Sequence, residues 1–132
     1  MADISKIKTP DGTIYNIKDD NAATKLDIAT TSATLSDSHF SSIILRKSGG
    51  VKFLSIGSVN SNTAMDTTNN YVQYFTLPEE YRPIGTVVTH FQSYANGAIN
   101  SWMIRIATNG TVSLLNRDGV EHPGFSNTFT FI

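Results

Sequence analysis

The sequence predicts an all-β protein, an antiparallel β-sandwich of jelly-roll-like type preceded by a short β-hairpin and a helix or linker arm. From His39 onward, short apolar runs alternate with turn signals and show no helical period. Seven or eight such runs within roughly 95 residues are typical of a sandwich. The 132 residues, of which 39% are hydrophobic, suffice for one modest domain with a core of ordinary density.

Charge and composition argue against nucleic acid and membranes as binding partners. Lys and Arg (10) nearly balance Asp and Glu (11), so no basic field is available to hold nucleic acid. No apolar run approaches the roughly 20 residues that span a bilayer, and the start lacks the features of a signal peptide, so no membrane partner is expected. The chain is therefore expected to be made in a cytoplasm. The absence of cysteine excludes disulfides and thiolate chemistry.

The first segment, residues 4–18, is predicted to form a hairpin. Pro10-Asp11-Gly12 favours a type I turn that ends in a left-handed glycine, which gives a three-residue loop. One face of this ribbon is apolar, and because two strands alone are marginal in water, that face should dock on the rest of the chain or on another component. The predicted opposite pairs are Ile7 with Tyr15 and Ser5 with Ile17.

A short helix is predicted next, because Asp19 and Asp20 are good N-terminal capping residues and small or apolar residues then follow a heptad spacing. The seam consists of Ala22, Leu26, Ala29 and Ala33. Two alanine-rich heptads nucleate poorly, so a brief helix and an extended linker are favoured over a three-stranded coil. Thr30 to Ser38 is the predicted linker. The predicted division is an attachment arm, residues 1–38, and a β-sandwich domain, residues 39–132.

The first hairpin of the domain is predicted from Phe40–Lys47 and Val51–Val59, which flank Gly49-Gly50. A two-residue turn there creates one buried face, with Leu45 opposite Leu54 and Ile43 opposite Ile56. Residues 60–70 are polar and turn-prone, and are predicted to form a long loop that belongs neither to the core nor to a strand.

Two prolines mark the next segment. Pro78 fixes its own φ and Pro83 makes the residue before it extended, which predicts a stiff, exposed corner between strands Tyr71–Leu77 and Ile84–Phe91. Such a corner lets a chain cross from one sheet to another. Both faces of the second strand are partly apolar, which suits a strand packed on its own core and on a neighbouring subunit.

The final hairpin is predicted from Trp102–Ala107 and Thr111–Leu115. A three-residue loop sets Ile106 opposite Val112 and Ile104 opposite Leu114, whereas a two-residue loop would mix polar with apolar residues. A loop from Tyr94 to Asn100 precedes this hairpin. A polar connection, residues 116–124, follows it, and residues 125–132 close the chain as a strand with Phe129 and Phe131 on one face.

Three stretches carry a resemblance to a known class of protein. They are Leu77-Pro78-Glu79-Glu80-Tyr81-Arg82-Pro83, the run Ile104 to Val112, and the opening Ile4 to Asp19. They resemble head-fibre, tail-fibre and baseplate appendage proteins of bacteriophages and prophages of Gram-positive hosts. The resemblance covers roughly half of the chain and implies a homotrimeric virion protein. It also implies that residues 1–38 bind other virion proteins.

Catalytic motifs are absent from the sequence. His39, His90 and His122 lack metal-ligand spacing, so no metal or other cofactor is predicted. Ile56-Gly57-Ser58-Val59-Asn60 is not a nucleophile elbow, because the second glycine is missing. The acidic candidates Asp66, Glu79, Glu80, Asp118 and Glu121 all fall in predicted loops. No catalytic residue is assigned, and the chain is not predicted to be an enzyme.

Saccharide recognition is the more plausible chemistry, because aromatic residues occur among asparagines. Trp102 shares the parity of Ile104 and is assigned to the core. Tyr94, Asn96 and Asn100 are the candidate binding residues. The predicted function is a short trimeric virion fibre or spike with adhesion to a host-wall saccharide. The alternatives are a purely structural capsid decoration, head-fibre or collar protein, and a free-standing carbohydrate-binding module.

Overall fold

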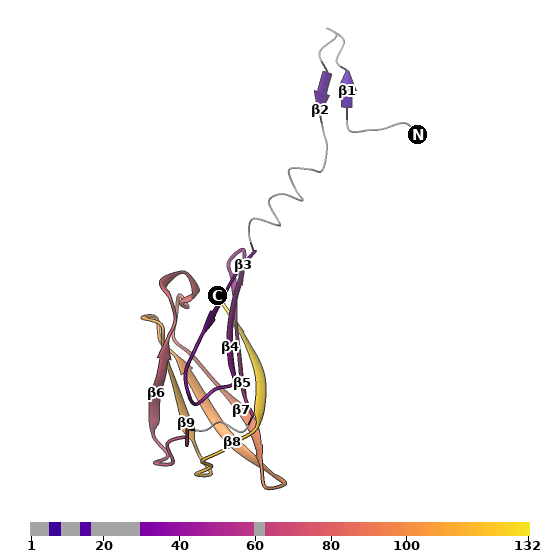
Figure 1. The fold of residues 1–132 in the computed structure, drawn as a ribbon. Helices are drawn as coiled ribbons and strands as arrows, with labels where there is room; N and C mark the ends of the chain where they lie inside the picture. Colours follow the sequence, from indigo (N-terminus) through magenta and orange to yellow (C-terminus); the bar gives the residue numbers. More distant parts are fainter. Residues whose placement is uncertain (1–5, 9–13, 17–29, 60–62) are drawn as a thin grey trace.

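The computed structural model describes residues 6–8, 14–16, 30–59 and 63–132, and its main body is a sandwich of two four-stranded antiparallel sheets (Figure 1). The predicted all-β sandwich is confirmed. The first sheet has the order β10-β5-β4-β3 and the second the order β6-β9-β8-β7. The strands are β3 (Thr30–Leu35), β4 (Ser42–Ser48), β5 (Val51–Ser58), β6 (Tyr71–Thr76), β7 (Val87–Ala95), β8 (Ala98–Ile106), β9 (Thr111–Asn116) and β10 (Phe125–Phe131).

The connections combine a meander with a Greek key. Strands β3, β4 and β5 follow one another in the first sheet, and the chain then crosses to β6. Strands β7, β8 and β9 form a second meander that returns β9 to the side of β6, which is the Greek-key arrangement. The chain crosses back to place β10 beside β5. A jelly roll contains two Greek keys, whereas the described strands form one, so the connectivity departs from the jelly-roll-like expectation.

The core lies between the sheets, and the two hairpin registers predicted from alternation are confirmed. Leu45 lies opposite Leu54 in the first sheet, and Ile104 lies opposite Leu114 in the second. All four side chains are at most 1% exposed. Trp102 is fully buried, as its parity predicts, and stacks on Phe91, from which it is separated by 5.7 Å between ring centroids. The predicted closing strand also contributes Phe125, Phe129 and Phe131 to the core.

The N-terminal hairpin is formed by β1 (Lys6–Lys8) and β2 (Ile14–Asn16), and the predicted pair Ile7 and Tyr15 is confirmed. The other predictions for this segment lie outside the described residues. They are the turn Pro10-Asp11-Gly12, the pair Ser5 and Ile17, the capping residues Asp19 and Asp20, and the seam residues Ala22, Leu26 and Ala29.

The linker predicted at residues 30–38 is wrong for its first six residues, because Thr30–Leu35 is strand β3 of the sandwich. This strand pairs along its whole length with β4, and Ala33 lies opposite Leu45 rather than in a helical seam. Ala33 and Leu35 pack against the core. Alternation in a strand of threonines and small residues is easily overlooked, because only two of its side chains are apolar. The sandwich therefore includes residues assigned to the arm.

The predicted exposed corner is also wrong. Strands β6 and β7 belong to the same sheet, at its opposite edges, so the proline segment does not carry the chain between sheets. Its middle forms a 3₁₀ turn, η1 (Glu79–Tyr81), and its apolar side chains Leu77, Tyr81 and Pro83 are buried. The Lys52 ammonium donates to the Arg82 carbonyl at 2.6 Å. The segment therefore covers one end of the core and contacts both sheets.

The loop before β6 contributes to the core, contrary to the prediction for residues 60–70. Met65 is 2% exposed and belongs to the buried cluster. Its amide donates to the carbonyl of Glu121 at 2.8 Å. A single methionine within a polar run gives no periodic signal, although its flexible side chain suits an irregular gap.

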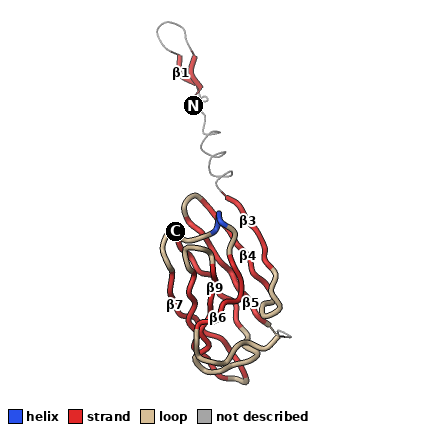
Figure 2. Tube along the Cα trace, turned by 90° about the vertical axis from the view of Figure 1, so that its left-hand side faces the viewer, coloured by secondary structure: helices blue, strands red, loops and turns tan. Residues whose placement is uncertain are grey.

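The two ends of the sandwich have different roles. Thr30 lies opposite Ser48 next to the Gly49-Gly50 turn, which places the start of β3 at one end, here called the entry end. Gly124 lies at the opposite end, here called the far end, and pairs with Tyr94. Figure 1 and the rotated view in Figure 2 agree that the β7–β8 turn is remote from the start of β3.

Candidate functional site

A cavity of about 600 Å³ opens at the far end of the sandwich. One wall comes from the turn between β7 and β8, and the other comes from the connection between β9 and β10. We call it the tip cavity. The residues that line it are Ala95, Asn96, Ala98, Asn100, Gly119, Val120, Glu121 and His122.

The first wall is a tight hairpin rather than the loop predicted from Tyr94 to Asn100. Asn96 and Gly97 have φ values of 51° and 76°, so both central residues adopt the left-handed region that a type I′ turn requires. Asn-Gly is the pair that best tolerates this geometry. The strands continue to the turn, where Ala95 lies opposite Ala98. The asparagine side chains at the cavity therefore stand on a regular ladder.

The second wall is held in place by Asn116, which is 2% exposed. Its side-chain nitrogen donates to the carbonyls of Val120 at 2.7 Å and Asp66 at 3.0 Å, and its oxygen accepts from the Val120 amide at 3.1 Å. The Asp118 carboxylate accepts from the Ser101 amide at 2.7 Å. This polar connection is therefore an ordered wall. Asn116 is not among the residues predicted from the sequence, because an asparagine in a polar run gives no sign that it is buried.

The two walls are joined by backbone hydrogen bonds. The Tyr94 amide donates to the Gly124 carbonyl and the Gly124 amide donates to the Tyr94 carbonyl, both at 2.8 Å. A reciprocal pair of this kind is a narrow antiparallel bridge. It fixes the distance between the hairpin and the β9–β10 connection.

The structure brings together two of the three predicted site residues and separates the third. Asn96 and Asn100 line the tip cavity. Tyr94 pairs with Ile99, whereas Asn100 pairs with Ser93, so Tyr94 and Asn100 point to opposite faces of the same hairpin. The Tyr94 side chain is 62% exposed on the outer face of the sheet. The predicted aromatic partner of the two asparagines is therefore not part of this cavity.

The lining of the tip cavity offers hydrogen-bond donors and acceptors at close range. Asn96 and Asn100 supply amides, Glu121 supplies a carboxylate, and His122 supplies an imidazole. The Asn100 side chain donates to the Ala98 carbonyl at 3.3 Å, which orients its amide. Ala95, Ala98 and Val120 add small apolar surfaces. Paired donors and acceptors beside small apolar patches suit a polyhydroxylated ligand.

A group of titratable residues also surrounds the β6 bulge. The ladder between β6 and β9 shifts register between Gln73 and Phe75, so Tyr74 is the bulged residue. Its hydroxyl accepts from the Asp66 amide at 3.1 Å. Burial raises the pKa of Tyr74, and hydrogen bonds from the hydroxyl and amide of Thr68 lower the pKa of Asp66. These contacts fasten the loop that carries Met65.

The three histidines lie apart in the structure. The His39 Nδ1–H donates to the Asp37 carboxylate at 2.7 Å, and the imidazole ring meets the Tyr74 ring edge to face, with 4.8 Å between the ring centroids. His90 is on the outer face of β7, and His122 lines the tip cavity. Over the described part of the chain, no three acidic, histidine or cysteine side chains are grouped so as to hold a metal ion.

Comparison with known proteins places the chain in no family, because no protein-family model and no curated protein matches it. Within the described ranges, no helix has the length and apolar character needed to cross a bilayer.

Proposed function

We propose that the chain is a bacteriophage virion protein that forms a short trimeric fibre or spike and adheres to a host-surface saccharide. The observation that carries the adhesive role is the position of the tip cavity. It opens at the far end of the sandwich, whereas β3, the first strand of the sandwich, begins at the entry end. A ligand site remote from the attachment arm is the arrangement that a surface-reaching spike needs.

The virion assignment is supported by the resemblance of the opening segment and of the stretches around Leu77–Pro83 and Ile104–Val112 to phage appendage proteins. In this proposal the hairpin of β1 and β2 belongs to the arm that binds other virion proteins. A free-standing carbohydrate-binding module has no need of such an arm.

The trimer is supported by exposed apolar side chains on the outer face of β7 and β8. Val88, Tyr94 and Ile99 are 53%, 62% and 58% exposed, and Tyr94 lies directly opposite Ile99. Tyr94 and Ile99 form an adjacent apolar pair near the β7–β8 turn, and Val88 lies farther along the same face; exposed apolar side chains of this kind can mark an interaction surface. In this proposal a neighbouring copy of the chain covers that face.

Binding at each tip cavity is expected to be weak. The cavity is lined mainly by small side chains, so a sugar buries little apolar area there, and affinity per site should be roughly millimolar. Three cavities on one spike would act together and raise the effective affinity without any new contact.

The test is binding of the labelled full-length protein to host cells and to purified wall polysaccharide. Asn96→Ala and Glu121→Gln should each weaken binding at least severalfold, because each removes a polar group from the cavity. Ser126→Ala on the other sheet is the matched control and should bind as the parent does. Circular dichroism checks that each variant remains folded.

The outcomes separate the alternatives. Loss of binding in the cavity variants alone supports saccharide adhesion at the tip. If the intact protein binds no surface of its host, the adhesive role is wrong and a purely structural role in capsid decoration or in a collar remains. If the protein binds saccharide but never co-purifies with virions, the virion role is wrong and the free-standing module is correct.

A further inference from the structure

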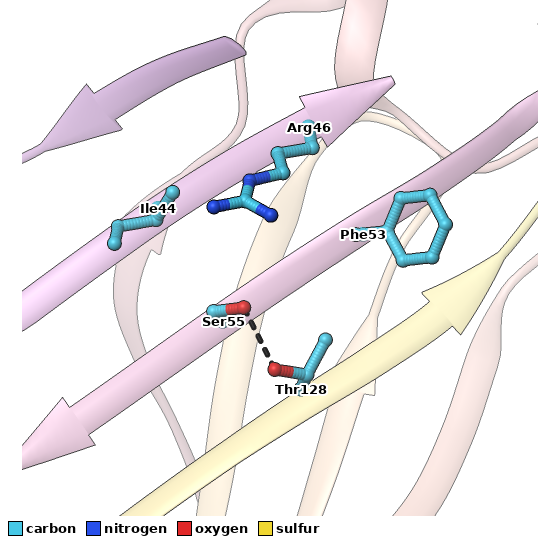
Figure 3. A pocket seen from close by; sticks show the side chains of 5 residues that line it. All are labelled: Ile44, Arg46, Phe53, Ser55 and Thr128. Carbon is cyan, nitrogen blue, oxygen red and sulfur yellow. Dashed lines mark hydrogen bonds between the residues drawn. The ribbon is translucent and has the colours of Figure 1, made fainter. Parts of the chain in front are cut away.

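A second hollow, of about 350 Å³, lies on the outer face of the first sheet. Figure 3 shows side chains that project from three neighbouring strands, β4, β5 and β10. We call it the sheet-face groove. It is lined by Ile44, Arg46, Phe53, Ser55 and Thr128.

The lining residues are cross-strand neighbours held in fixed register. Arg46 lies directly opposite Phe53, and Ile44 lies directly opposite Ser55. Ser55 in turn lies opposite Thr128, and their hydroxyls share a hydrogen bond of 2.8 Å. Two adjacent rows of the ladder therefore carry an arginine across from a phenylalanine and an isoleucine across from a serine. Figure 3 shows the Arg46 guanidinium extending toward Ile44 and Ser55, whereas the Phe53 ring points away from it. Side chains on interior strands are positioned more rigidly than side chains on loops.

Arg46 is the key charge of the groove. Alternation along the four strands leaves it as the one charged side chain on the outer face, where the other residues are apolar, glycine or hydroxyl-bearing. Within the described ranges its guanidinium makes no hydrogen bond or ion pair. Arg105, on the outer face of the other sheet, differs because its guanidinium lies over the Tyr71 ring, 4.4 Å from the centroid. The groove therefore presents an uncompensated positive charge.

We propose that the sheet-face groove binds a saccharide that carries an oxyanion, either a carboxylate or a phosphate. The planar guanidinium of Arg46 matches the oxygens of such a group. The Phe53 ring offers an apolar surface for the sugar ring, and Ser55 and Thr128 offer hydroxyl partners. This site does not depend on the tip cavity or on the proposed function.

The position of the groove argues against an extended peptide as its ligand. Peptides that recognise sheets add to an unpaired edge and gain backbone hydrogen bonds there. The groove is centred on β5, whose backbone is already paired on both sides, with β4 and with β10. A ligand there can be recognised only by side chains. The combination of ring, hydroxyls and cation then selects an acidic sugar.

The experiment is a titration of the full-length protein followed by amide chemical shifts, with glucuronate, glucose 6-phosphate and glucose as three separate probes. We expect shifts centred on the five lining residues with an anionic sugar and none with glucose. Binding should weaken as salt is added, because the charge is exposed. Glucuronate and glucose 6-phosphate distinguish a carboxylate ligand from a phosphate ligand, and binding of either one supports the proposal.

Arg46→Gln should weaken this binding roughly tenfold, because it removes a charge-assisted contact. Arg105→Gln is the charge-matched control and should leave the binding unchanged. The proposal is overturned if neither anionic sugar shifts the groove residues, or if glucose shifts them equally. It is also overturned if both arginine variants lose the same affinity. Shifts of the groove residues that depend on protein concentration without any sugar would instead make this face a contact between copies of the chain.

Discussion

The buried side-chain amide of Asn116 makes two hydrogen bonds with the backbone of Val120, one to its carbonyl and one from its amide. The amide nitrogen donates to the Val120 carbonyl at 2.7 Å, and the amide oxygen accepts from the Val120 backbone at 3.1 Å. The same nitrogen reaches the Asp66 carbonyl at 3.0 Å. One side chain thus joins the end of β9 to two loops at the far end.

Replacing Asn116 with alanine should destabilise the fold and loosen the second wall of the tip cavity. Buried groups that lose their partners cost about 1–3 kcal/mol each, so a loss of a few kcal/mol is expected. Chemical denaturation measures that loss, and hydrogen exchange should show faster exchange at the Val120 amide. Asn127→Ala is the control, because that side chain makes one long contact of 3.5 Å. Unchanged exchange at Val120 would contradict this role.

Two glycines with positive φ make a matched pair. Gly110 has φ +89°, and an added Cβ would lie 2.6 Å from the Leu77 carbonyl oxygen. Gly49 has φ +60°, with no atom within 4 Å of an added Cβ. Gly49→Ala should therefore cost only backbone strain, about 1–2 kcal/mol. Gly110→Ala should cost clearly more, since it also displaces the segment that covers the entry end. Thermal unfolding compares the stabilities of the two variants. Equal losses of stability would show that the close approach to the Leu77 carbonyl does not contribute to the cost of Gly110→Ala.

The position of β3 predicts where the sandwich can be truncated. A chain that begins at Thr30 keeps all eight strands of the sandwich and should remain folded and soluble. A chain that begins at Ser36 loses β3, which uncovers the backbone edge of β4 and part of the core, and exposed edges promote aggregation. Size-exclusion chromatography and circular dichroism distinguish the two truncations. Equal behaviour would mean that Thr30–Leu35 is dispensable, as in a linker.

Tyr74 should make stability depend on alkaline pH. Burial raises its pKa above the ordinary value of 10.0. The folded state therefore retains the proton more tightly than the unfolded state. This contribution is complete below pH 10 and is lost as the pH rises through the folded-state pKa. Tyr74→Phe should be less stable at neutral pH by about 1 kcal/mol, since the Asp66 amide loses its acceptor. Its unfolding free energy should fall less than that of the parent between pH 9 and 11.

The proposed trimer predicts that charge on the outer face of β8 will separate the subunits. Ile99→Lys should shift the mass measured by light scattering from three chains towards one, because lysine is poorly tolerated in a buried interface. Val59→Lys is the control. Val59 is also exposed, at 67%, but it directly follows β5 of the other sheet and lies outside the outer face of β7 and β8. A parent protein that is monomeric at micromolar concentration would contradict the trimer before any variant is made.

Local rules allowed much of the sandwich to be predicted. The Gly49-Gly50 turn and the Thr108-Asn109-Gly110 loop each define a register, and one register in each hairpin pairs apolar side chains on the buried face, Leu45 with Leu54 and Ile104 with Leu114. The burial of Trp102 follows from the same alternation. Strand β3 was not predicted, because its threonines and small residues alternate too weakly between apolar and polar to distinguish a strand from a linker.

The sequence by itself therefore determined the fold class, the hairpins with short loops and the inward faces of their strands, because neighbours in the chain fix these through turn geometry and a period of two. Only the tertiary structure decided what each irregular segment packs against. It buried Tyr81 in a corner expected to be exposed, and it separated Tyr94 from Asn100 across one hairpin. It also placed the Asn116 side chain where its hydrogen bonds to Val120 hold the second wall of the tip cavity. Such outcomes depend on contacts between residues distant in sequence, which alternation does not encode.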